Sequence, residues 1–151
     1  MTTKTTARRT NDRPARPLVA VVLATSLLIV AAFHAALTLG APFGAAAMGG
    51  TNPGKLPDPV RLVTGLATAL WFMAAMMVLA RGGRALLPVP PAVARIGTWG
   101  LLGLLGLGAV MNIASPSPWE RFGWGPFTLL MLGLCLVLAR SGSPRHPATR
   151  R

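Results

Sequence analysis

Nine residues of this chain have side chains whose types and spacing could bind or transform a small molecule. His34 titrates near neutral pH, Glu120 carries a carboxylate, and Asn112 offers both donors and acceptors. A histidine and a carboxylate that reach one substrate atom can act as general acid and base. The candidate ligand-binding set is His34, Arg61, Thr64, Thr68, Asn112, Ser115, Glu120, Arg121 and Trp124.

His34 is the only ionisable residue clearly inside a long apolar stretch. Ionisable groups in a membrane are costly and usually face a bundle interior or a cavity. One interpretation makes His34 a ligand contact, or a proton donor and acceptor, in an outward-facing pocket. The other makes it a neutral imidazole that hydrogen-bonds Asn112 or a threonine and ties helices together, and we favour this one.

Two further patterns group the remaining polar residues near one membrane boundary. Arg61, Thr64 and Thr68 follow the three- and four-residue spacing of a single helix face. Glu120 is expected to pair with Arg61 or Arg121 at the outer rim, where an ion pair contributes little stability. All three acidic residues are expected to lie outside the membrane spans.

Other kinds of chemistry find no support in the sequence. Cys135 is the single cysteine, so no disulfide or redox thiol pair can form within the chain, and we expect it to be a packing residue. No metal-ligand spacing or nucleophile motif is present, so we predict no catalytic residue, metal or cofactor. The net charge of +12 does not indicate nucleic acid, because the basic residues do not alternate with stacking aromatics.

The elements that must position these residues are four apolar runs, 18–40, 62–80, 96–114 and 122–139. A hydrocarbon core about 30 Å thick requires roughly 20 helical residues, and all four runs are close to that length. Continuous apolar runs rich in Leu and Ala favour helices over a barrel. At 23 residues the first run also exceeds a signal-peptide core of about 7–15 residues. The sequence thus predicts an all-α, polytopic four-helix bundle.

The basic residues predict how this bundle is oriented. Of the 15 Lys and Arg residues, twelve fall in the two tails and the connector after the second run, on one side of the bilayer. Lys55, Arg61 and Arg121 fall on the other side. Because basic loops are retained in the cytoplasm, both termini are expected there, in the cell membrane of a bacterium. Residues 1–17 and 140–151 read as disordered basic tails that flank a membrane domain at 18–139.

Two connecting features bear on function and assembly. The connector at 41–60 is rich in Gly and Pro and apolar at 43–48, so we expect it to re-enter the membrane or to lie over the bundle mouth as a lid. Glycines recur through the third run, at 97, 100, 103, 106 and 108. They predict close helix packing within a monomer, and a seam for a homo-oligomer or another membrane partner is the alternative.

Two segments carry a resemblance to a known group. The first reads HAALTLGAPFG at 34–44 and continues with Gly49-Gly50, Lys55-Leu56-Pro57 and Arg61. The second reads MNIASPS at 111–117, then Trp119-Glu120-Arg121 and Trp124-Gly125-Pro126. Over residues 18–139 the chain resembles an uncharacterised group of small four-span membrane proteins of high-GC Gram-positive (actinobacterial) bacteria. The resemblance implies four helices and an outer-face grouping of these residues, and it implies no activity.

Three functions remain open from the sequence, in this order. The first is a non-enzymatic membrane protein whose outward-facing polar pocket binds a lipid or small apolar ligand, or docks a partner protein. The second is an enzyme that uses His34 and Glu120 as acid and base on a lipid. The third is a small proton-coupled exporter, ranked last because such proteins usually carry an acid within the membrane.

Overall fold

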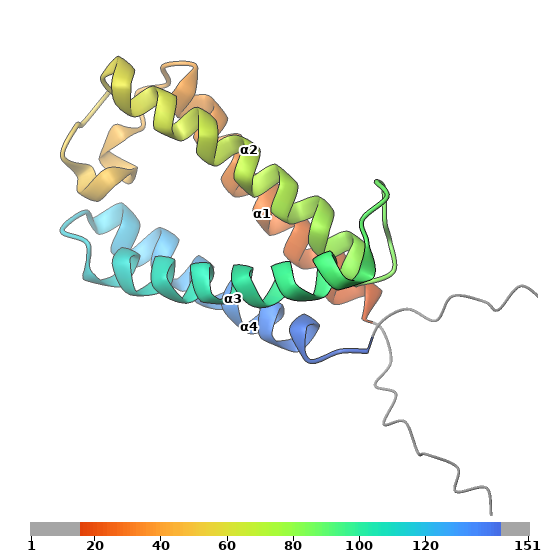
Figure 1. Cartoon of the computed structure of the whole chain (residues 1–151). Helices are drawn as coiled ribbons and strands as arrows, with labels where there is room; N and C mark the ends of the chain where they lie inside the picture. Colours follow the sequence, from red (N-terminus) through yellow and green to blue (C-terminus); the bar gives the residue numbers. More distant parts are fainter. Residues whose placement is uncertain (1–15, 143–151) are drawn as a thin grey trace, which may run out of the picture.

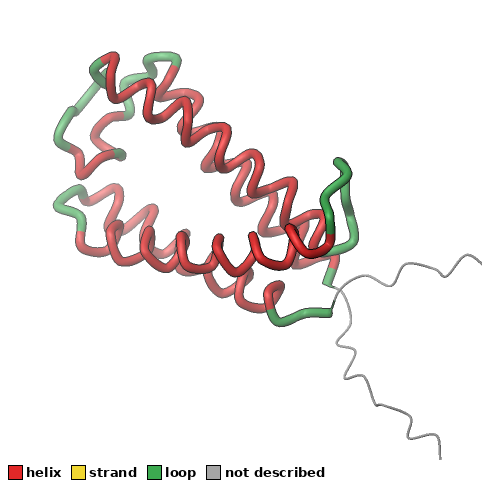
Figure 2. Tube along the Cα trace, in the orientation of Figure 1, coloured by secondary structure: helices red, strands yellow, loops and turns green. Residues whose placement is uncertain are grey.

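The computed structural model describes residues 16–142 and consists of four long helices joined by short connectors. Figures 1 and 2 show these elements, and no strand occurs between residues 16 and 142. The predicted all-α four-helix bundle is therefore confirmed. Most of the two predicted tails, 1–15 and 143–151, lies outside the described residues. The long helices are α1 (Pro17–Thr38), α2 (Asp58–Arg81), α3 (Pro91–Ala114) and α4 (Gly125–Ala139), with short turns η1 (Gly44–Ala46), η2 (Met48–Gly50) and η3 (Glu120–Trp124).

All four helical segments are long and apolar enough to cross a membrane, the fourth being the continuous stretch Glu120–Ala139. Each exposes large apolar side chains along much of its length, such as Leu18, Leu66, Leu107 and Leu130. A bundle dissolved in water would bury such side chains, whereas a bundle surrounded by acyl chains has no reason to.

Proline marks the start of every long helix, because its missing N–H is one that a first turn leaves unbonded anyway. Helices α2 and α3 begin four and five residues before the predicted runs, at Asp58 and Pro91. The sequence prediction missed the first turns of these helices because it delimited each run by its apolar residues, and these turns contain polar and charged ones. Asp58 is thus the first residue of a spanning helix and not part of a connector.

The fourth helix begins with a π-helical turn that the sequence did not predict. In η3 the N–H of Gly125 bonds the carbonyl of Glu120, five residues back. Pro126 follows at once, and its ring cannot donate to the carbonyl four residues before it. The wider turn accommodates this proline without ending the helix. Glu120 and Arg121 consequently belong to the fourth helical segment and not to the preceding connector.

The helices form two hairpins, α1 with α2 and α3 with α4, that converge at one end and diverge at the other (Figure 1). We call the converging end the terminal end, because α1 begins there, α4 ends there, and the 82–90 connector lies there. We call the other the lid end, because the segment 41–57, hereafter the lid, lies there with the connector 115–119.

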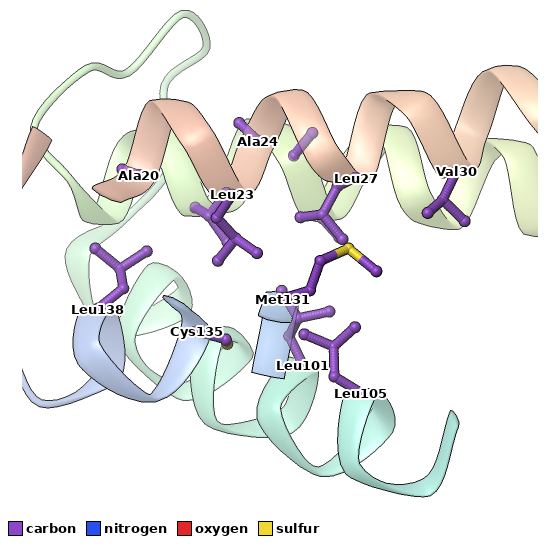
Figure 3. Close-up of a cluster of buried hydrophobic side chains, with 13 residues drawn as sticks. Ala20, Leu23, Ala24, Leu27, Val30, Leu101, Leu105, Met131, Cys135 and Leu138 are labelled. Atoms are coloured by element: carbon purple, nitrogen blue, oxygen red, sulfur yellow. The ribbon is translucent and has the colours of Figure 1, made fainter. Parts of the chain in front are cut away.

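The main core lies where the hairpins converge. Figure 3 shows Leu23, Leu27 and Val30 of α1 directed at the other hairpin, which contributes the buried side chains Leu101, Leu105, Met131, Cys135 and Leu138. Cys135 is fully buried and its Sγ lies 3.5 Å from the carbonyl oxygen of Thr98, so the expectation of a packing residue is confirmed. Small residues also let α1 and the end of α2 approach each other closely, since a Cβ on Gly82 would overlap the Cβ of the buried Ala20.

Arg81 joins the two hairpins at the terminal end. Its side chain is buried and donates to the carbonyl oxygens of Gly142, Ala139 and Ser141, at 3.1 and 3.5 Å for the first two. The last carbonyls of a helix have no partner within it and carry partial negative charge. Arg81 of α2 therefore caps α4 with a full positive charge.

The glycines of α3 do not pack as the sequence suggested. A Cβ on Gly97 would overlap the sulfur of Met77, but a Cβ on Gly100 or Gly103 would meet nothing within 4 Å. Close packing within the monomer thus holds at Gly97 and is wrong for Gly100 and Gly103. The reason is that Gly100 and Gly103 lie on an exposed face of α3.

Candidate functional site

A cavity of about 350 Å³ lies at the lid end, where the hairpins have diverged. All four helical segments and the lid contribute to its wall. Most of the lining is apolar, and the polar side chains that reach it are few. The lining residues are Val30, Phe33, His34, Ala46, Ala47, Met48, Trp71, Leu104, Leu105, Leu107, Gly108, Met111, Asn112, Glu120, Trp124, Thr128 and Met131.

The lid covers the mouth of this cavity, as one of the two expectations for the 41–60 connector stated. It folds tightly on itself, since a Cβ on Gly44 would overlap the backbone oxygens of Asn52 and Gly54. Two side chains of the opposite hairpin donate to lid carbonyls, Ser117 Oγ to Ala45 at 2.7 Å and Trp124 Nε1 to Ala46 at 3.1 Å.

Glu120 provides a third link to the lid and corrects two expectations. Its side chain is only 8% exposed, and Oε1 accepts the backbone N–H of Gly49 at 3.0 Å. The predicted rim pair with Arg61 or Arg121 is wrong, and so is the placement of every acid outside the spans. The π-turn rotates the carboxylate towards the cavity, and both arginines bond other partners.

His34 also lines the cavity but does not tie helices together in the predicted way. Its Nδ1 lies 2.9 Å from the carbonyl oxygen of Val30 in its own helix. Because a carbonyl only accepts, Nδ1 carries the proton, and Nε2 of the neutral ring is an acceptor. The hydrogen bond to Asn112 or a threonine is therefore not made. Instead the ring lies near Trp71 and Phe33, with centroids 6.5 and 5.9 Å away.

Asn112 joins α3 to α4 beside the cavity. Its Nδ2 donates to Thr128 Oγ1 at 3.1 Å, and that hydroxyl donates to the carbonyl of Trp124 at 2.7 Å. The indole of Trp124 packs on Phe33, with centroids 4.7 Å apart. Trp124 is thus a half-buried wall of the cavity as well as a link to the lid.

Three of the predicted site residues lie elsewhere, along the seam between α1 and α2. Thr64 Oγ1 is 2.9 Å from Thr38 Oγ1, and Arg61 Nε donates to the Thr38 carbonyl at 2.8 Å. Arg61 also pairs with Asp58 at 2.9 Å. Thr68 bonds the carbonyl of Thr64 within its own helix. The shared helix face was predicted correctly, but it faces α1 and not the cavity.

Ser115 and Arg121 shape the connector instead of the cavity. Arg121 donates from Nε and from a terminal nitrogen to the Ser115 carbonyl, at 3.1 and 2.8 Å. The hydroxyl of Ser115 accepts the N–H of Ser117, which places Ser117 to bond the lid. These two residues therefore support the lid contacts indirectly. Of the nine predicted residues, His34, Asn112, Glu120 and Trp124 line the cavity.

Among the lining residues outside the predicted set, two are aromatic, Phe33 and Trp71, and one carries a hydroxyl, Thr128. A signal for Trp71 exists in the sequence: Thr64, Thr68 and Trp71 recur at helical spacing, so they share one face. Thr64 contacts Thr38 of α1, and α1 runs antiparallel to α2. Trp71, two turns after Thr64, must therefore lie near His34, about one turn before Thr38. Phe33 and Thr128 carry no comparable signal, because apolar and hydroxyl residues abound in every run.

No group of His, Cys, Asp or Glu that could hold a metal ion occurs in the described part of the chain. Comparisons with models of protein families, with curated proteins and with solved structures find no significant match for this chain.

Proposed function

We propose that this chain is a membrane protein that binds a small amphiphile, or one chain of a lipid, in the cavity at its lid end. The observation that carries the proposal is the cavity itself. Its volume is at the lower end of the range of about 300–1,000 Å³ that is typical of small-molecule sites. A mostly apolar wall with a few convergent polar groups is the composition that such sites have.

The exposed part of the cavity wall supports a ligand that arrives from the bilayer. Leu107 and Met111 line the cavity and are 62% and 64% exposed. Both lie on α3, a segment apolar enough to span the membrane. The side of the cavity next to α3 is therefore continuous with surface that acyl chains cover. A ligand dissolved in the lipid can reach the cavity from there without crossing the lid.

The side of the membrane on which the termini lie, and the identity of that membrane, are part of the same proposal. The connectors at the terminal end, with the tails, carry twelve basic residues, and Lys55, Arg61 and Arg121 are at the other end. Retention of basic segments in the cytoplasm then puts the termini inside and the lid outside a bacterial cell membrane. Membership of the actinobacterial four-span group that the chain resembles is proposed with it.

Fusions at the C-terminus test the orientation: a fluorescent protein should be bright and alkaline phosphatase inactive, and the opposite result would invert the topology.

Ligand binding is tested with a photoactivatable decanol that carries a diazirine on its chain. We expect it to crosslink to cavity residues of the purified protein in nanodiscs, and mass spectrometry of the labelled peptides locates the site. The cavity is filled by Gly108→Leu, since a Cβ at Gly108 makes only an ordinary contact, 3.8 Å from Thr128 Cγ2. This variant should lose most of the labelling at the lid end.

The matched control is Gly103→Leu, the same change on the same helix. A Cβ at Gly103 meets nothing within 4 Å, and this residue does not line the cavity. Labelling should therefore persist in this variant. Equal labelling of both variants and the wild-type chain would show that the probe reports lipid-facing surface, and the proposed function would be wrong.

A second candidate function, proton-coupled export, gains from one observation. Such exporters usually need an acid within the membrane, and Glu120 belongs to the spanning segment Glu120–Ala139 and faces the cavity. Uptake of a lipophilic cation into proteoliposomes, driven by a pH gradient and lost in Glu120→Gln, would favour transport over simple binding.

The enzymatic alternative keeps a geometric basis, because His34 and Glu120 line one cavity. Their hydrogen bonds are structural, however: one ring nitrogen of His34 bonds Val30, and one carboxylate oxygen of Glu120 bonds Gly49. We therefore rank binding above catalysis. Turnover of a defined lipid by the wild-type chain, abolished in His34→Ala, would reverse that order.

A further inference from the structure

The hydrogen-bonding capacity left inside the cavity is mainly acceptor capacity. Asn112 Nδ2, the Thr128 hydroxyl and Trp124 Nε1 donate to protein partners. Two neutral side-chain donors of the lining have no partner among residues 16–142, the indole N–H of Trp71 and the second N–H of Asn112. The lone pair of His34 Nε2, the carbonyl oxygen of Asn112 and the second carboxylate oxygen of Glu120 remain as acceptors.

The charges around the cavity are equally one-sided. Among residues 16–142, Glu120 is the only acidic residue of the lining, and no Lys or Arg lines the cavity. Arg61 is paired with Asp58, and Arg121 with the carbonyl of Ser115. The Glu120 carboxylate accepts one hydrogen bond, from the backbone N–H of Gly49. A carboxylate this buried is costly unless a counter-charge or further donors reach it.

Aromatic rings complete the wall. Phe33, Trp71 and Trp124 all line the cavity, and Trp124 lies one helical turn beyond Glu120. The faces of such rings attract cations, most strongly where water is excluded. A cationic hydrogen-bond donor would complement all three features of the cavity, namely its acceptors, its negative charge and its aromatic faces.

Resting on the proposed function, we propose that the natural ligand is an amphiphile with a protonated primary amine. The alkyl chain lies along Leu104, Leu105 and Met131, and the ammonium reaches Glu120 under the lid. The three N–H groups of an ammonium match the three acceptors of His34, Asn112 and Glu120. Because Glu120 also bonds Gly49, ligand binding and lid closure act on one carboxylate.

Competition against the photoactivatable decanol tests this ligand class. Decylamine and decanol have the same chain length and differ in the head group, and an alkylamine is protonated at pH 7. We expect decylamine to displace the probe at a concentration at least about tenfold lower than decanol, since charged hydrogen bonds in a cavity contribute roughly that much.

Glu120→Gln identifies the residue responsible. The amide oxygen of glutamine still accepts the Gly49 N–H, so the lid contact remains while the charge is removed. The preference for decylamine over decanol, a ratio of two displacement concentrations measured on the same variant, should fall at least about tenfold. Asp58→Asn is the matched control, because Asp58 is an acid at the same end that is 89% exposed and lies outside the cavity.

The outcomes separate the two proposals. If the probe does not label the cavity at all, the proposed function is wrong. If it labels the cavity but decylamine and decanol compete equally, the cavity binds amphiphiles and the amine proposal is overturned. An equal loss of preference in Asp58→Asn and Glu120→Gln would trace the effect to surface charge and would overturn it as well.

Discussion

The two ends of this bundle are built from the same four helices but in opposite ways. At the terminal end the hairpins meet through Leu23 and Leu138, and the buried Arg81 holds α4 to α2. At the lid end the same helices stand apart, and a lid covers a cavity with polar groups in its wall.

This difference separates the residues that stabilise the fold from those available for binding. Apolar side chains and small residues fill the terminal end, and the buried Arg81 there donates to carbonyls of the last residue of α4 and of the residues just after it. At the lid end Glu120 and His34 keep acceptor atoms facing open volume. Substitutions at the terminal end should therefore act on global stability, and substitutions at the lid end on the lid and its ligand.

Arg81→Ala should give the largest loss of stability. It removes bonds to the carbonyls of Ala139, Ser141 and Gly142 and leaves the end of α4 uncapped. We expect about 3 kcal/mol, measured by unfolding in mixed micelles. Arg84→Ala, an exposed arginine of the same connector, should change the free energy by less than about 0.5 kcal/mol. An equal loss in both would assign the effect to connector charge.

Gly82→Ala and Gly44→Ala apply one change to both ends. At Gly82 the new Cβ would overlap the Cβ of the buried Ala20, so we expect a loss of about 1–3 kcal/mol in global stability. At Gly44 it would overlap backbone of the lid, so protease cleavage within the lid should increase while the unfolding midpoint changes less. Gly100→Ala, in open space, is the control for both. A larger global effect at Gly44 would contradict the division between the ends.

Ser117→Ala should loosen the lid by about 1 kcal/mol without affecting the bundle. It removes the 2.7 Å hydrogen bond to Ala45, and a single neutral bond contributes about that much. Hydrogen exchange of the amides at 44–50 should become several-fold faster, while the exchange of α1 amides stays constant. In Ser26→Ala, whose hydroxyl bonds Val22 in its own helix, lid exchange should not change.

Thr64→Val should have the smallest effect, about 0.6 kcal/mol, because hydrogen bonds between membrane helices contribute that little on average. The substitution removes the bond to Thr38 between α1 and α2. Thr68→Val removes a hydroxyl that bonds only its own helix and should cost less. A loss well above 1 kcal/mol at Thr64 would mean that this seam, and not only the terminal end, determines stability.

The sequence predicted the number and approximate bounds of the helices, and the lid, for a local reason. In lipid each segment must satisfy its own backbone hydrogen bonds, so its length and hydropathy are sufficient evidence. The errors occurred where polar residues continue a helix. The first turns of α2 and α3 were missed, and Glu120 and Arg121 were assigned to a connector because the fourth apolar run was taken to begin at Phe122.

The candidate site was only partly predictable. Depth along a helix can be counted, so His34, Asn112 and Trp124 were correctly expected near one boundary. The direction in which a side chain points around the bundle cannot be counted in the same way. Arg61 and Thr64 lie at that boundary too, yet they bond Thr38 in the α1–α2 seam.

The sequence alone thus determined four apolar helices, their separation by charged connectors and a Gly/Pro-rich segment over one end. The tertiary structure alone decided that the hairpins diverge, that Glu120 bonds Gly49, and that Arg81 caps α4. The physical reason is that helices form from interactions four residues apart, whereas these contacts join residues about 60 to 70 positions apart. Only the packing of whole helices brings such residues together.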